Sequence, residues 1–120
     1  LAVDLLGQVV AETLDGAQVS GVGGLADFAR GARLSRGGRS IVALLSSARG
    51  GSVSRIVPRL GADDIVGLSR LDIDTVVTEH GVAELGPLDV DARAQALIAI
   101  AAPAHRAALQ AAWLAQRSRL

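Results

Sequence analysis

A glutamate and a histidine stand together directly after an apolar segment of the chain. Glu79 and His80 follow residues 73–78 and precede Gly81. A carboxylate at the end of a buried strand can act as a base, a nucleophile or an orienting acceptor, because burial raises its pKa and a nearby cation lowers it. In the alternative interpretation, Glu79 only accepts backbone N–H groups of the following turn, and His80 is structural or exposed.

Glycines gather in a second segment, Gly21-Val22-Gly23-Gly24, which precedes a pattern of helical spacing. Successive glycines let backbone N–H groups approach a ligand closely, and the positive end of a helix adds to such an array. The segment could therefore hold a phosphate or the oxyanion of an acyl-transfer intermediate. The alternative is a tight strand-to-helix turn that binds nothing.

Extended to Ala26, this glycine segment formally matches the G-x-G-x-x-[GA] fingerprint of dinucleotide sites. A true fingerprint follows a long buried strand and leads to an acidic residue after the next strand. Here the preceding apolar stretch is short, and the next expected strand ends in Ser46-Ser47. Dinucleotide binding is therefore disfavoured. A serine nucleophile is disfavoured as well, because Ser46 and Ser47 lack the G-x-S-x-G elbow.

The composition argues against several other classes of function. Twelve basic and twelve acidic residues give a formal net charge of zero, so the 120-residue chain carries no electrostatic footprint for nucleic acid. All the basic residues are arginine, which removes a phosphate-loop or Schiff-base lysine. No cysteine is present, and His80 and His105 lack metal-ligand spacing. No metal site is expected, and His105 is expected at the surface.

The cellular setting is inferred from what the chain does not contain. No segment reaches the roughly 18 apolar residues of a membrane span, and no signal peptide is recognisable. A cytoplasmic protein without membrane contact is therefore expected. The chain starts at Leu1 rather than methionine, which suggests an excised domain, a processed chain or an incomplete record.

Turn and periodicity signals predict an α/β chain with a mixed sheet. Helices are expected over residues 25–34, 90–102 and 104–116, with Asp89 as an N-cap. Strands are expected over residues 1–10, 17–20, 40–45, 53–57, 65–68 and 73–78. The continuous apolar run 40–45 is typical of a strand buried on both faces, and Asp15-Gly16 is a hairpin signal.

Six segments, taken in order, resemble the C-terminal part of the acetyl-CoA hydrolase/transferase family. Each segment alone is modest, but six in the right order are specific. They are VDLLGQV (3–9), SGVGGLADFARGA (20–32), GGRSIVAL (37–44), SRIVP (54–58), VVTEHGVAEL (76–85) and RAQALIAIA (93–101). The resemblance implies an α/β fold of the class I CoA-transferase (NagB/RpiA-like) type, with a mixed, largely parallel sheet flanked by helices.

The resemblance also implies a chemistry. Members of this family move CoA between an acyl-CoA and a carboxylate, or hydrolyse the acyl-CoA, through a glutamate nucleophile and a glutamyl-CoA thioester. The motif of that nucleophile lies upstream of the matched region and is not found here. Glu79 matches the glutamate of the family's Glu-Tyr/His-Gly-Val-Ala motif, which is a supporting active-site residue. Gly23 and Gly24 are both candidates for the oxyanion-hole amide, with no choice between them.

Coenzyme A is therefore the expected ligand, as substrate and product. The residues expected at its site are Gly21, Val22, Gly23, Gly24, Ser46, Ser47, His80 and Gly81. The expected partners are an acyl-CoA, a small carboxylate and an N-terminal domain or subunit, and the resemblance leaves a homo-oligomer open. Residues 1–120 are interpreted as the C-terminal portion of such a domain, with little or no turnover alone.

The chain also departs from the common family pattern, at Leu45, Ser69-Arg70 and Gly86-Pro87. These departures bear on substrate preference and on the geometry of the CoA loop, and they leave the expected fold intact. The alternative function is a non-catalytic acyl-CoA-binding or interaction module on the same fold.

Overall fold

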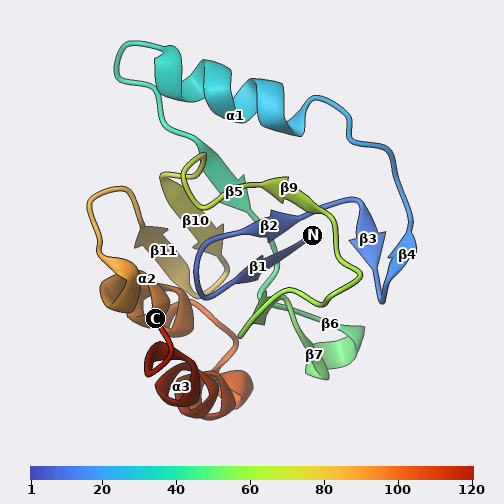
Figure 1. Cartoon of the computed structure of the whole chain (residues 1–120), viewed down its shortest axis with the longest axis vertical. Coiled ribbons are helices and arrows are strands. Elements are labelled where there is room, and N and C mark those ends of the chain that lie inside the picture. The colour runs from blue at the N-terminus through green and yellow to red at the C-terminus, as the bar shows by residue number, and fades with distance from the viewer.

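The computed structural model describes all 120 residues, which form eleven strands, three α-helices and one 3-10 turn (Figure 1). The helices are α1 (Leu25–Leu34), α2 (Val90–Ala99) and α3 (Pro103–Arg117), and the 3-10 turn is η1 (Arg49–Gly51). The α/β class predicted from the sequence is confirmed. None of these helices is long and apolar enough to cross a membrane.

Two small sheets form the framework. The first has the order β8-β1-β2-β9 and the second has the order β11-β10-β5. The pairs β1–β8 and β5–β10 are parallel, whereas β1–β2, β2–β9 and β10–β11 are antiparallel, so the pairing is mixed as expected. The strands are β1 (Ala2–Asp4), β2 (Val9–Val10), β8 (Ile56–Val57), β9 (Val66–Leu68), β5 (Ile41–Ala43), β10 (Thr75–Thr78) and β11 (Gly81–Glu84).

Two short hairpins complete the strand inventory. The pair β3 (Thr13–Leu14) and β4 (Ala17–Gln18) is joined by Asp15-Gly16, as the turn signal predicted. Both turn residues have positive φ angles, of 52° and 76°. That geometry suits the right-handed twist of the flanking strands. The other hairpin pairs β6 (Ser47–Ala48) with β7 (Val53–Ser54) around η1.

The helices follow the sequence patterns closely. The helix α1 has the predicted bounds. The N-cap prediction is also confirmed, because the Asp89 side chain accepts the Ala92 N–H at 2.8 Å. The helix α2 ends at Ala99, three residues earlier than predicted, and Pro103 becomes the first residue of α3. Proline suits that position because its missing N–H would have no helical partner there.

Two strand predictions are wrong in detail, and the strands β3, β6 and β11 were not predicted. Residues 1–10 form two strands rather than one, because Asp4 Oδ1 accepts the N–H groups of Leu6 and Gln8 and turns the chain back. Residues 53–57 divide into β7 and β8. The strand β11, which forms a hairpin with β10, had no counterpart in the sequence prediction.

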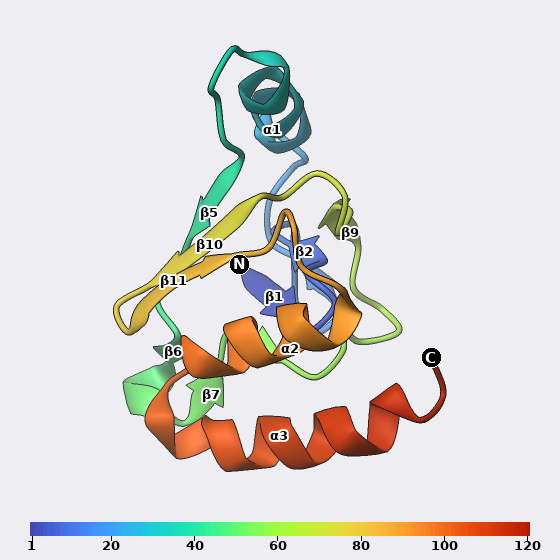
Figure 2. The same cartoon turned by 90° about the vertical axis from the view of Figure 1, so that its left-hand side faces the viewer.

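One apolar core joins the two sheets to α2 and α3. Its largest fully buried side chains are Trp113, Leu5, Ile56, Leu68, Ile73, Leu85 and Leu97. Figure 2 shows α2 and α3 stacked on the same side of the molecule, with α1 at the opposite end. The core therefore fixes the hairpin β10–β11 against α2, and this hairpin carries Glu79 and His80.

The strand β5 contradicts one prediction. Val42 is buried, but Ile41 and Ala43 on either side of it are exposed. The apolar run 40–45 is thus buried on one face only, and not on both faces as its composition indicated. Within these 120 residues, no element covers the outer face of the sheet.

Candidate functional site

Glu79 and His80 form the tip of the hairpin between β10 and β11. Thr78 pairs with Gly81 across the hairpin, so Glu79 and His80 are its two turn residues. Gly81 has a φ angle of 147°, a backbone conformation that L side chains rarely adopt. The carboxylate therefore lies where β10 ends, as the sequence predicted.

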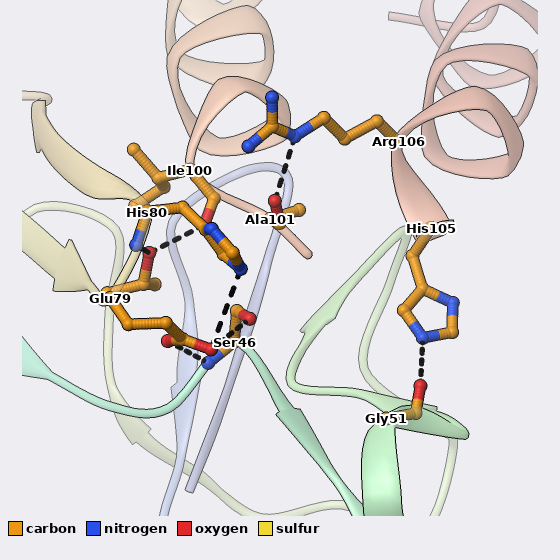
Figure 3. A network of polar contacts seen from close by, with 9 residues as sticks. Ser46, Gly51, Glu79, His80, Ile100, Ala101, His105 and Arg106 are labelled. Carbon is orange, nitrogen blue, oxygen red and sulfur yellow. Dashed lines mark hydrogen bonds and ion pairs between the residues drawn. The ribbon is translucent and has the colours of Figure 1, made fainter. Parts of the chain in front are cut away.

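Ser46, which follows β5, holds the Glu79 carboxylate with both of its donors. The Ser46 hydroxyl donates to Glu79 Oε1 at 2.7 Å, and the Ser46 backbone N–H donates to Oε2 at 2.8 Å (Figure 3). These bonds, the hydroxyl bond first, lower the pKa of Glu79 to about 2 from an ordinary value of 4.5. The parallel pairing of β5 with β10 brings the two strand ends together.

The Glu79 side chain is 41% exposed, whereas Ser46 is completely buried beneath it. The carboxylate is thus anchored on one side and open to solvent on the other. An ionised, oriented and accessible carboxylate can accept hydrogen bonds from an incoming ligand.

His80 lies beside Glu79 without a close contact. Its Nε2 is 3.7 Å from Glu79 Oε1, a separation that makes an ion pair only when the ring is protonated. The His80 backbone N–H donates to Thr78 Oγ1 at 3.1 Å. His80 therefore supports the turn through its main chain, and its side chain stays partly exposed.

The junction of α2 and α3 braces this site from behind. The Thr78 hydroxyl donates to the Ile100 carbonyl at 2.6 Å, just beyond the end of α2. Arg106 Nε donates to the Ala101 carbonyl at 2.8 Å, and the His105 ring bonds to the Gly51 carbonyl at 2.8 Å (Figure 3). The same junction thus holds both the Glu79 hairpin and the loop that follows Ser46.

Sequence reasoning missed Thr78 and did not assign His105 a contact. Both residues act through main-chain carbonyls of segments distant in sequence, and local patterns carry no signal for such contacts. The only local hint is that Thr78 is the polar residue ending a strand directly before Glu79.

The structure does not bring the glycine segment to Glu79. The glycines lie in the exposed loop before α1. That helix and the hairpin β6–β7, which begins next to Ser46, occupy opposite ends of the molecule (Figure 1). Gly23 has a φ angle of 54°, and a Cβ on Gly24 would lie 3.0 Å from the Phe28 ring. Gly23 therefore meets a local backbone requirement, whereas the exposed Phe28 ring has room to move away from a side chain at position 24.

The dinucleotide alternative gains no support from this loop. The residues before it form the exposed two-residue strand β4 rather than a long buried strand. Ser46 and Ser47 also differ from each other. Ser46 is engaged with Glu79, whereas Ser47 is half-buried and pairs in β6 with Ser54.

The sequence matches a family of enzymes. The acetyl-CoA hydrolase/transferase C-terminal domain matches residues 1–113. The 4-hydroxybutyrate coenzyme A transferase of Clostridium kluyveri is 51% identical over 107 residues, 89% of this chain and 25% of that protein. The succinyl-CoA:cyclohexane-1-carboxylate CoA transferase of Geobacter metallireducens is 46% identical over 109 residues, 91% of this chain and 25% of that protein. The chain spans about a quarter of the length of the curated relatives it matches.

Solved structures agree with this match. RipA from Yersinia pestis superimposes with a TM-score of 0.89 and 42% identity, over 98% of this chain and 26% of that one. The 4-hydroxybutyrate CoA-transferase of Porphyromonas gingivalis gives a TM-score of 0.73 and 41% identity, over 100% of this chain and 25% of that one. The family model covers residues 1–113, and the solved structures agree with it in fold and sequence. The chain therefore belongs to the acetyl-CoA hydrolase/transferase family and corresponds to the C-terminal domain of that family.

Proposed function

We propose that this chain is part of an enzyme that transfers CoA between an acyl-CoA and a carboxylate. Glu79 serves as a supporting acceptor, and the nucleophilic glutamate lies in a part of the enzyme outside these 120 residues. The relatives named as CoA-transferases support the reaction class. The single observation that carries the proposal is the Glu79 carboxylate, held by Ser46 at an accessible hairpin tip.

The low pKa of Glu79 favours one of the roles left open by the sequence. A general base works best when its pKa lies near the working pH, and a carboxylate with a pKa of about 2 is far from that condition at neutral pH. Glu79 instead stays ionised and oriented. We assign it to accepting hydrogen bonds from the amide N–H groups in the pantetheine arm of the acyl-CoA, which fixes the thioester relative to the nucleophile.

The transfer proceeds by acyl substitution in two halves. The nucleophilic carboxylate attacks the thioester carbonyl and the C–S bond breaks. CoA leaves as a thiolate, and an acyl-glutamyl anhydride remains on the enzyme. The thiolate then attacks the glutamyl carbonyl of the anhydride, releases the carboxylate product and forms a glutamyl-CoA thioester. In the second half, another carboxylate attacks the glutamyl-CoA thioester, which releases the CoA thiolate and forms a new anhydride. The thiolate then attacks the acyl carbonyl of this anhydride, which gives the new acyl-CoA and frees the glutamate. Each attack places negative charge on a carbonyl oxygen.

The glycine loop is the proposed site for that negative charge. Gly23 and Gly24 precede α1, so their backbone N–H groups lie at the positive end of a helix. The loop and Glu79 are separated within this chain. The proposal therefore requires the acyl-CoA, together with the rest of the enzyme, to span the distance between them.

The test uses the natural gene product at its full length. An acyl-CoA and a labelled carboxylate are mixed with it, and label appearing in the acyl-CoA is measured. Borohydride reduction followed by peptide mass analysis detects the glutamyl-CoA thioester. We expect exchange and one reduced glutamate outside residues 1–120. Binding of acyl-CoA without exchange would refute the proposal and favour the non-catalytic module.

A further inference from the structure

The sheet β11–β10–β5 is covered on one face only. Val42, Val76 and Ala83 are cross-strand neighbours on its inner face, and all three are buried. The helix α2 packs against β11 on this side. In Figure 2 no helix or strand lies against the opposite side of these three strands.

Apolar side chains occupy the centre of the outer face, and Thr75 and Glu84 lie beside Ile41 in the next row. Ala43, Val77 and Val82 form one row across the three strands, and Ile41 belongs to the neighbouring row on the same face. Ile41 is 58% exposed and Val82 is 60% exposed, while Val77 is half-buried. Large contiguous exposed apolar patches on soluble proteins mark interaction sites.

The strand pairing adds an independent argument. The strands β5 and β10 are parallel within a mixed sheet, and parallel strands of α/β proteins commonly belong to sheets that are covered on both faces. The strand β5 is also the outermost strand of its sheet, so backbone groups along its free edge can pair with a further strand. An open face and an open edge at the same strand point to a missing neighbour.

The apolar surface continues from the sheet to α1. A groove of about 290 Å³ runs between this helix and β5, lined mostly by hydrophobic side chains that include Phe28 and Ile41. Phe28 is 82% exposed. The exposed ion pair of Arg39 with Glu84, at 2.7 Å, borders the face on its polar side. An apolar centre with a charged rim is the usual anatomy of an interface.

We propose that this outer face, with the free edge of β5 and the groove beside Phe28, is the docking surface for the N-terminal part of a CoA-transferase chain of this family. The family match identifies these residues as a C-terminal domain, and the relatives are about four times as long as the chain. The remaining three quarters of such a relative is ample to supply the missing layer and strand. The proposal concerns assembly and does not depend on the role of Glu79.

The experiment compares two pairs of substitutions in the natural gene product. Ile41→Asp with Val82→Asp places two carboxylates on the proposed docking surface. Val19→Asp with Val53→Asp is the matched control, because both of those residues are also exposed in the structure but lie beside β4 and on β7. Thermal unfolding midpoints are measured for each protein.

We expect the docking pair to lower the midpoint of the full-length protein by about 5 °C or more, because buried carboxylates are strongly unfavourable. The control pair leaves the midpoint unchanged. The docking pair is also expected to speed hydrogen exchange of the β5 amides at least tenfold, because the edge of β5 loses its cover.

Three results would overturn the proposal. One is an unchanged midpoint in the full-length protein. Another is a natural gene product of only 120 residues. The third is a homodimer of the natural gene product, seen by sedimentation, that the docking pair dissociates, because a second copy would then be the occupant. All these measurements report on assembly, so a failed exchange assay leaves them interpretable.

Discussion

Ser46 and Glu79 are 33 positions apart in the sequence, yet both donor groups of the serine engage the two carboxylate oxygens of the glutamate, at 2.7 and 2.8 Å. The serine is buried and the carboxylate is half open to solvent. This pair fixes the direction of a charge at the surface of the protein. It depends on the parallel pairing of β5 and β10, which places the two strand ends side by side.

Replacement of Ser46 by alanine is expected to raise the pKa of Glu79. The hydroxyl bond is the largest cause of the lowered value, so its loss moves the pKa from about 2 toward the ordinary 4.5, and the remaining backbone bond keeps it short of that value. Carboxyl NMR titration measures the change. Ser54→Ala serves as control, because the Ser54 hydroxyl bonds only to the Ile56 carbonyl. An unmoved Glu79 pKa would remove Ser46 from this role.

Glu79 is expected to make stability depend on pH in the acid range. Its pKa in the folded state lies below the ordinary value, so the ionised group stabilises the fold above about pH 4.5. That contribution is lost as the pH falls from 4.5 toward 2. The difference in unfolding midpoint between the wild type and Glu79→Gln should therefore be constant above pH 5 and shrink below it. A difference that does not change with pH would contradict the assignment, and Asp63→Asn, at an exposed carboxylate, is the control.

Thr78→Val is expected to destabilise the protein by about 1–3 kcal/mol, the usual effect of leaving a buried carbonyl without its partner. The carbonyl concerned is that of Ile100, which the Thr78 hydroxyl reaches at 2.6 Å. Thr75→Val is the matched control, since Thr75 is a buried threonine of the same strand with no side-chain hydrogen bond. Urea unfolding followed by circular dichroism measures both. Equal effects would mean that the bond to the Ile100 carbonyl adds nothing to the general effect of replacing a buried hydroxyl by a methyl group.

The link between α2 and α3 makes a separate prediction. Trp113 is fully buried, and its indole N–H donates to Asp91 Oδ1 at 2.6 Å, the main cause of the lowered pKa of Asp91. Trp113→Phe should raise that pKa and lower the unfolding midpoint. Leu114→Ala, at a half-exposed position of the same helix, should leave the Asp91 pKa in place. NMR titration of Asp91 decides between these outcomes.

Local sequence signals predicted the elements that local physics determines. The bounds of α1, the Asp89 cap and the Asp15-Gly16 hairpin depend on side-chain spacing and turn chemistry alone, and all three are confirmed. The position of Glu79 at the end of β10 followed from the apolar run before it. The family resemblance supplied the reaction class, which no spacing in this chain could specify.

The parts that sequence did not predict depend on distant neighbours. The bonds of Ser46 to Glu79 and of Thr78 to Ile100 join segments that meet only in the folded chain. The expected burial of residues 40–45 on both faces is contradicted by the exposed Ile41 and Ala43. The apolar composition of that run fits a strand covered on both sides, and the second covering layer is the one proposed for the rest of the enzyme.

The most direct test of the central proposal is the rate of CoA transfer by the full-length gene product with Glu79→Gln, set against Asp63→Asn. The amide keeps the shape of Glu79 but loses its charge. The proposal predicts a fall in kcat/KM of about 100-fold for Glu79→Gln, comparable to the loss of one preorganised polar contact, and a wild-type rate for Asp63→Asn. An unchanged rate for Glu79→Gln, in an enzyme with measurable exchange, would contradict a role for Glu79 in the reaction.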